Sequence, residues 1–249
     1  MNLTRLMAAT LLIEIFSFAP AAGTPRSDVR PNHSSPAAKA VYYDFKGARL
    51  GMSLAEWRAL PPPSTTVSAP DKGIEEGPDQ PVCIGDGEGD STLLNVRTTA
   101  ESKANVLVCG YAHREKLFGT TGVAWTHVGW IGAAIPIGEL SAQDVQYKFL
   151  DGSLYEISIT GDAGLLDEVM SGLRAKWGEP TSVINDATQN KLGATFPHSV
   201  RTWANPVAAI RVETPFHEIE SLNVTYVTIA GLAKLTAIEK ATNPDMDKM

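Results

Sequence analysis

The fold of the C-terminal half is decided by one stretch, which reads Val145-Gln146-Tyr147-Lys148-Phe149-Leu150-Asp151-Gly152-Ser153-Leu154-Tyr155-Glu156-Ile157-Ser158-Ile159. Apolar and polar residues alternate on both sides of Asp151-Gly152, as in strands that bury one face. An Asp-Gly pair suits a two-residue turn, because glycine tolerates the positive φ that the turn requires. The stretch therefore predicts a β-hairpin.

A helix is predicted directly after the hairpin, over residues 163–177. Gly178 suits the end of a helix, and Pro180 prevents its continuation. The apolar residues fall at helical spacing on one face, which should pack on a sheet. They are Leu165, Leu166, Val169, Met170, Leu173 and Trp177.

Strands are predicted again at 181–184, 199–204, 208–212 and 221–229, followed by a short helix at 231–240. We write this C-terminal order as β-β-α-β-β-β. Such an order favours an antiparallel sheet with a helix packed on one face. The fold class is therefore expected to be α+β, with antiparallel sheets and few helices.

The N-terminal half gives weaker signals. Ser53 and Glu56 have the spacing of a capping box, which predicts a helix over 54–60. Residues 61–92 are expected to be mostly loop, with strands at 93–98, 104–111 and 123–131. The expected organisation is a signal peptide (1–23), a flexible leader (24–40), a β-rich module tied by a disulfide (41–138), the β-β-α-β-β-β module (139–241) and a flexible tail (242–249).

Composition indicates a folded, acidic protein. Hydrophobic residues make up 43% of the 249 residues, and the net charge is −7. A basic stripe of the kind that neutralises phosphates is missing, so a nucleic-acid partner is not expected. The two cysteines, Cys83 and Cys109, are expected to pair in an oxidising compartment. A reduced Cys109 beside His113 is the catalytic alternative.

The first residues resemble an export signal. Arg5 precedes the apolar stretch 6–13, and Ala19-Pro20-Ala21 offers a cleavage site, although Glu14 interrupts the pattern. The uncharged stretch 117–138 is rich in glycine and is expected to form short strands instead of a membrane span. We expect a periplasmic or secreted protein with no stable membrane insertion of the mature chain.

Three short motifs carry a family resemblance. Phe45-Lys46-Gly47-Ala48-Arg49-Leu50-Gly51-Met52-Ser53 begins a helix, Tyr147–Gly152 forms the hairpin, and Trp177-Gly178-Glu179-Pro180 ends the second helix. With two central cysteines, this pattern resembles uncharacterised exported proteins of proteobacteria. The helix start is also similar to small outer-membrane assembly lipoproteins and β-lactamase-inhibitor-like repeats, but this chain lacks their lipid-bearing cysteine, and its strand order differs. Neither resemblance implies a catalytic residue.

Two clusters are candidate binding sites. Trp125, His127 and Trp130 lie in one uncharged segment, and such side chains bind partner proteins or sugar rings when exposed; core packing is the alternative. Asp86, Glu88 and Asp90 alternate with glycines and could bind Ca²⁺, although the spacing is not that of a twelve-residue calcium loop. A solvated acidic loop is the simpler interpretation.

The sequence shows no recognisable set of catalytic residues. Gly89-Asp90-Ser91-Thr92 is similar to the nucleophile block of Gly-Asp-Ser esterases, but the Asp-x-x-His that supplies their base is missing. We expect a non-enzymatic envelope protein that binds another protein or assists assembly, without a cofactor. The alternatives are a secreted hydrolase whose site comes from distant residues, and a calcium- or glycan-binding module.

Export predicts that the mature chain begins between Ala22 and Thr24, because cleavage should follow Ala21 closely. Mass spectrometry of the protein recovered from the envelope should show this N-terminus. Protein recovered from the cytoplasm with Met1 intact would contradict the prediction.

Overall fold

A computed structural model describes residues 41–61, 74–83, 97–118, 124–131, 135–137, 140–142, 144–189, 193–216 and 220–243. At 74–80, 112–118, 124–131, 135–136, 140–142 and 144 it describes the backbone only. The described residues all belong to one compact unit, Lys39–Met249. The predicted signal peptide and leader lie outside the described residues, as does 244–249 of the predicted tail.

The predicted hairpin is confirmed. It consists of β8 (Asp144–Leu150) and β9 (Ser153–Asp162), which pair antiparallel with Tyr147 opposite Ile157. Both turn residues have positive φ, 51° at Asp151 and 77° at Gly152. This is the backbone conformation for which the Asp-Gly pair is suited.

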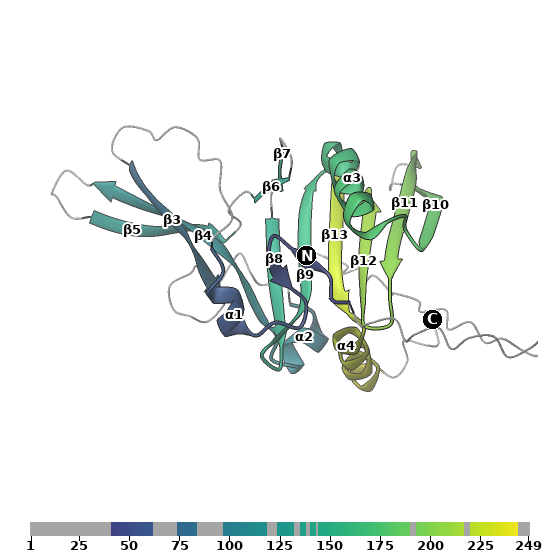
Figure 1. The fold of residues 1–249 in the computed structure, drawn as a ribbon, viewed down its shortest axis with the longest axis horizontal. Coiled ribbons are helices and arrows are strands. Elements are labelled where there is room, and N and C mark those ends of the chain that lie inside the picture. The colour runs from purple at the N-terminus through teal and green to yellow at the C-terminus, as the bar shows by residue number, and fades with distance from the viewer. Residues whose placement is uncertain are drawn as a thin grey trace, which may run out of the picture. The chain divides into compact units, whose positions relative to one another are not determined.

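The hairpin lies inside a nine-stranded antiparallel sheet (Figure 1). Eight strands follow the order β10-β11-β12-β13-β9-β8-β4-β3, and β5 pairs with β4 beside this path. The further strands are β3 (Ile74–Cys83), β4 (Leu107–Phe118), β5 (Ala124–Ile131), β10 (Ser182–Gln189), β11 (Thr195–Ala204), β12 (Ala208–Thr214) and β13 (Ser221–Thr228). Two small hairpins accompany the sheet, β1 (Asp44–Phe45) with β2 (Ala48–Arg49), and β6 (Ile135–Ile137) with β7 (Leu140–Ala142).

The predicted fold class is confirmed, since the sheets are antiparallel and the helices few. The C-terminal order agrees roughly with β-β-α-β-β-β. The four strands predicted after the helix correspond to β10, β11, β12 and β13, one more than that order counts, and β10 continues beyond its predicted end to Gln189. Strands from both predicted modules share the large sheet, since β4 pairs with β8.

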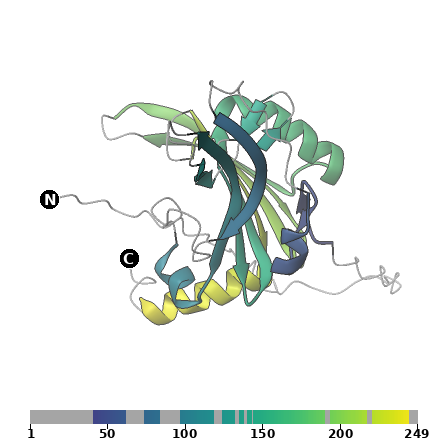
Figure 2. The same cartoon turned by 90° about the vertical axis from the view of Figure 1, so that its left-hand side faces the viewer.

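The helices cover different parts of the sheet. α3 (Leu166–Trp177), preceded by the 3₁₀ turn η1 (Ala163–Leu165), lies along one face, while α4 (Ile229–Thr242) lies at one end beside α2 (Thr99–Lys103) (Figure 2). The predicted helix at 163–177 is thus confirmed. The capping box of α1 (Leu54–Arg58) is also present, with Ser53 and Glu56 exchanging both hydrogen bonds.

The main core lies between α3, the N-terminal segment with α1, and one face of the sheet. Alternate residues of β8, β9, β13 and β12 form directly opposed apolar pairs across this face, as cross-strand packing requires. The rows run Val145–Ile159–Val224–Val212 and Tyr147–Ile157–Tyr226–Ile210. A smaller apolar cluster lies at the α4 end and contains Val106, Val108, Leu150, Tyr155 and Val227.

The prediction of loop over 61–92 is wrong for residues 74–83, which form β3. Pro78, Pro81 and the acidic residues disfavour a central strand, but β3 lies at the end of the strand order and bends between Gly77 and Gln80. Edge strands tolerate proline because its missing N–H can face away from the ladder. Cys83 lies opposite Cys109 in β4, and the two form the predicted disulfide.

The strand predicted at 93–98 is wrong for residues 97 and 98, which are not in a strand. Residues 93–96 lie outside the described residues. Thr98 is the N-cap of α2 and exchanges hydrogen bonds with Glu101, so these two residues form a second capping box. The Thr-x-x-Glu spacing is visible in the sequence. The capping box favours a helix start, the neighbouring threonines favour a strand, and the structure has the helix at this position.

Leu173 tests the packing of α3, because it is buried in the main core. Leu173→Ala should lower the free energy of unfolding by about 2–5 kcal/mol, measured by urea denaturation. Ser171→Ala is the matched control on the exposed side of α3 and should change stability by less than about 0.5 kcal/mol. A Leu173→Ala cost as small as that of the control would show that this face of α3 is not a filled core.

Candidate functional site

The second face of the sheet is polar over β8–β12, although much of it is partly buried. The register places Gln146 opposite Ser158, Ser158 opposite Thr225, and Thr225 opposite Arg211. Asn223 is only 7% exposed, and its amide donates to Ser158 and Thr160. We call this surface the polar face; it comprises Gln146, Ser158, Thr160, His198, Arg211, Glu213, Asn223 and Thr225.

A charged network lies at the β10–β12 end of the polar face. His198 Nδ1 is 2.5 Å from Asp186 Oδ1, and His198 Nε2 is 3.1 Å from Glu213 Oε1. Arg211 Nη2 lies 3.1 Å from the other oxygen of Glu213. Three adjacent strands therefore contribute one continuous chain of four charged or ionisable side chains.

The network favours a protonated His198. Partial burial lowers the pKa of the imidazole, but the hydrogen bonds and charges of Asp186 and Glu213 outweigh this effect and raise the pKa above 6.5. Each ring nitrogen faces a carboxylate. A histidine in this arrangement has no free nitrogen with which to accept a substrate proton or bind a metal ion.

A second network ties α2 to the hairpin. Lys148 Nζ lies 2.7 Å from Glu101 Oε1 and 2.9 Å from Glu156 Oε1, and the Tyr155 hydroxyl donates to Glu101 Oε1 at 2.7 Å. Burial raises the pKa of Glu101, but the charge and hydrogen bonds of Lys148, Thr98 and Tyr155 outweigh it, so the net shift is downward.

This second network is best interpreted as structural. Glu101 is 3% exposed and also caps the N-terminus of α2, so its carboxylate has no room for a ligand. Burial lowers the pKa of Lys148, but the two carboxylates outweigh it and raise the pKa overall. Removing one member would leave a buried charge unpaired, which is strongly destabilising.

The outer edge of the sheet is formed by β10, whose eight residues are all exposed. Within the described part of the chain, β10 pairs with β11 alone. Val183 and Ile184 are 49% and 54% exposed, and they are two of the four large apolar side chains that are exposed among the described residues. Among the described residues, this edge therefore has no strand paired beyond it and carries two apolar side chains.

The predicted binding residues Trp125, His127 and Trp130 lie on β5, which pairs antiparallel with β4. Trp125 is opposite Leu117 and His127 opposite Glu115, while the register shifts between Val128 and Ile131. The structure describes the backbone of β5 and not its side chains, so the proposed surface stays a prediction.

The structure bears on some of the other sites predicted from the sequence and not on the rest. Asp86, Glu88, Asp90 and Ser91 lie outside the described residues, so the calcium and esterase hypotheses are not addressed. Cys109 is bonded to Cys83 and therefore has no thiolate to pair with His113. Among the residues whose placement is described, no group of three or more His, Cys, Asp or Glu side chains is arranged for a metal ion.

No protein-family model, curated protein or solved structure matches this chain. The resemblance to exported proteins of proteobacteria therefore stays a prediction. In the described part of the chain, none of the helices has the length and apolar character needed to cross a membrane. The disulfide fits a protein from an oxidising compartment.

The His198 network is not predicted by the sequence patterns described above. Its members are separated by 12 and 15 residues along the chain, and only the register of β10, β11 and β12 brings them together. A strand predicted as far as residue 189 would have included Asp186, but the register that places it opposite His198 comes only from the structure.

The His198 network predicts a pH-dependent contribution to stability. Because the folded-state pKa is raised, the contribution is fully present below about pH 6.5 and is lost as pH rises through the folded-state pKa. An NMR titration of His198 should show this raised pKa, and Glu213→Gln should lower it. Glu179→Gln is the control, because Glu179 pairs with Arg174 instead. A His198 pKa unaffected by Glu213→Gln would contradict the assignment.

Proposed function

We propose that the protein is a non-enzymatic protein of the bacterial envelope, periplasmic or secreted, that binds another protein by adding a strand of that partner to β10. The observation that carries the proposal is the exposed apolar edge at Val183 and Ile184. Strand addition is a recurring mode of peptide recognition, in which backbone hydrogen bonds give affinity and alternate side chains give specificity.

The composition of β10 supports this proposal. Proteins usually protect sheet edges with charges, prolines or bulges, because an open edge attracts other strands. β3 has such protection, with Pro78, Pro81, three acidic residues and a bulge. β10 has one charged residue, Asp186, no proline and regular pairing with β11 over all eight residues. This difference is expected if the β10 edge is kept open for a partner.

The position of the apolar residues favours a different protein over a second copy. Val183 and Ile184 lie near the start of β10, while Ala187, Thr188 and Gln189 lie near its end. In a two-fold antiparallel pair centred on the strand, Val183 would face Thr188 of the other copy. A partner strand with apolar residues opposite Val183 and Ile184 would bury both side chains better.

Like β10, β5 has few charged residues and pairs on one side only among the described residues, so it is also a candidate for partner binding. β5 contains Trp125, His127 and Trp130 but no Asp, Glu, Lys or Arg, and within the described residues it pairs only with β4. We keep these residues as a second, separate candidate surface, because β5 pairs with β4 near the opposite end of the strand order from β10. The engagement of both His198 nitrogens by carboxylates also supports binding over catalysis at the polar face.

Crosslinking can identify the partner. A photoreactive amino acid in place of Ile184 should crosslink to another envelope protein in intact cells. The same amino acid in place of Val41, which is 44% exposed, should not give this product. Crosslinks from position 184 to a second copy of the chain alone would contradict the proposal and indicate self-association.

With that partner purified, Ile184→Lys should weaken binding at least about tenfold, because a charged edge residue opposes strand addition and loses the apolar contact. Val41→Lys is the matched control and should bind as the wild type does. Hydrogen exchange should show protection of amides in 182–189 on binding. Equal affinity of both variants, or unchanged exchange in β10, would refute the proposed binding mode.

A further inference from the structure

His198 connects the β10 edge to the inner sheet through both of its ring nitrogens. The residue belongs to β11, its Nδ1 faces Asp186 of β10, and its Nε2 faces Glu213 of β12. A neutral imidazole has one N–H, and only the protonated ring has two. The ring therefore donates to both carboxylates, and bridges all three strands, only while it is protonated.

The two carboxylates differ in what they lose when the ring becomes neutral. The Glu213 side chain is 16% exposed, and its other oxygen lies 3.1 Å from Arg211 Nη2. Asp186 makes the shorter contact with the ring, but its side chain is 57% exposed, and among the described residues His198 is its single ionic partner. Water can solvate the exposed carboxylate, whereas a mostly buried one that loses its donor is unfavourable. The one N–H of a neutral ring therefore stays with Glu213, and the link to β10 is lost.

β10 depends on this link more than the inner strands depend on any one side chain. All eight of its residues are exposed, and none belongs to the apolar clusters formed by the described residues. In the described part of the chain, β10 pairs with β11 alone. Segments with few buried contacts and exposed backbone hydrogen bonds open locally at low cost. A charge-assisted hydrogen bond between Asp186 and His198 opposes that opening.

His198 is the member of the network that titrates near neutral pH. Arg211 stays charged, and Asp186 and Glu213 stay ionised, between about pH 5.5 and about pH 9. The charges of the four groups cancel while the ring is protonated, and one negative charge remains when it is neutral. Partial burial lowers the pKa of His198, but the two carboxylates outweigh this effect and raise it above 6.5.

We propose that His198 is a pH switch for the β10 edge: the protonated ring holds β10 extended on β11, and loss of the proton frees Asp186 and lets β10 fray. This half of the inference concerns the free protein. Its consequence for a partner rests on the proposed function. Because a partner strand adds only to an ordered edge, its apparent affinity should fall as pH rises and the ordered fraction of β10 decreases.

Hydrogen exchange tests the switch in the free protein. Exchange rates of the β10 amides that pair with β11 are measured from about pH 5.5 to about pH 9 and divided by the intrinsic rate at each pH. Protection should fall at least about tenfold, with a midpoint at the pKa that NMR gives for the His198 ring, while amides of β13 keep theirs. At high pH, ring ¹⁵N shifts should place the proton on Nε2. Protection of β10 that does not follow the His198 titration, or a neutral ring protonated on Nδ1, would overturn the proposal.

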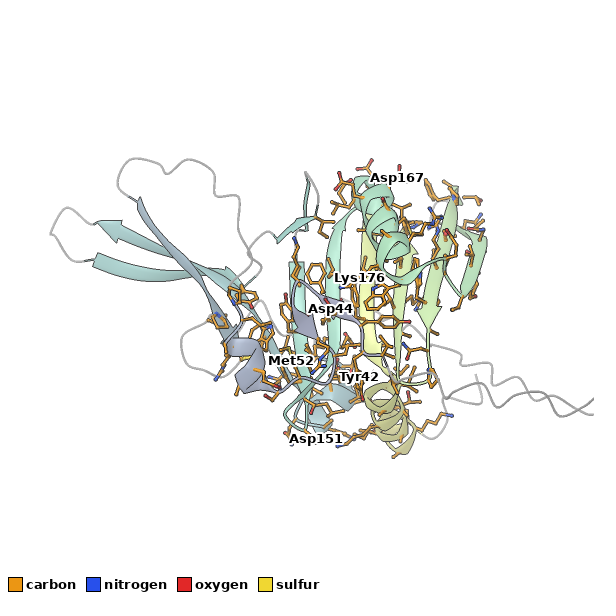
Figure 3. The ribbon with its side chains drawn as sticks, viewed as in Figure 1. Tyr42, Asp44, Met52, Asp151, Asp167 and Lys176 are labelled. Carbon is orange, nitrogen blue, oxygen red and sulfur yellow. A yellow bond between two sulfur atoms is a disulfide. The ribbon has the colours of Figure 1, made fainter. Side chains whose placement is uncertain are left out.

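Variants separate the charge of the ring from its presence, and β13 protection shows that each one folds. His198→Gln should leave β10 poorly protected at every pH, whereas His198→Lys keeps a cation beside Asp186 and should keep β10 protected throughout. The matched control is Lys234→Gln, which breaks an exposed ion pair with Asp151 at the turn between β8 and β9, away from β10 (Figure 3). This control should keep the wild-type pH profile. A β10 strand that still responds to pH in His198→Gln would refute the switch.

The switch and the binding function can fail separately. The partner captured at position 184 should bind the wild type at least about tenfold more weakly at about pH 9 than at about pH 5.5, and His198→Lys equally at both. If β10 protection follows His198 but no envelope protein is captured, the proposed function fails and the switch stands. If a partner binds with the same affinity at both pH values, the binding function stands and its regulation by His198 is refuted.

Discussion

The structure depends on the pairing of β4 with β8 through Leu107, Val108 and Cys109. On one side of β4, β5 follows β8 from Ala112 onward, while β3 pairs along the other side from Cys109 onward, so this short ladder links β3 and β5 to the rest of the sheet. The disulfide fixes β3 at the same point, because Cys109 lies between Cys83 and Tyr147. Trp57 of α1 packs there against three rings, those of Tyr111, Tyr147 and Phe149. Burial raises the pKa of Tyr111 to about 12, as expected for a hydroxyl enclosed by apolar groups.

The two faces of the sheet differ in character, one being apolar and the other polar. One face buries alternating aliphatic and aromatic residues beneath α3, and this burial supplies most of the stability. The other face carries hydrogen-bonded polar side chains and the His198 network, and of the described helices α4 and α2 lie over one end of it. Polar groups at such positions are satisfied by one another across the strands, so the face needs no helix over its whole length.

The candidate binding features lie at a sheet edge and at a cavity beside a helix. Within the described residues, β10 ends the sheet with no strand paired beyond it, and a cavity of about 190 Å³ lies between α3 and the strands beneath it. Both include residues that a sequence optimised for stability alone would change, namely exposed Ile184 at an edge and Gly172 within a helix. Such departures from local preference are expected at functional positions, because function and stability are selected together.

The sequence by itself determined the elements whose signals are local. The 145–159 hairpin, the apolar face of α3 and the Ser53–Glu56 cap are each specified by residues within one or two turns of one another, and the disulfide follows from having two cysteines. Tertiary structure decided the rest. β3 is a strand despite Pro78 and Pro81 because β4 offers it a ladder at the sheet edge. The His198 network joins residues of three strands, and the cavity beside α3 is lined by residues of several elements, so both depend on strand register and helix position. These are set by packing between distant segments, which local sequence preferences do not encode.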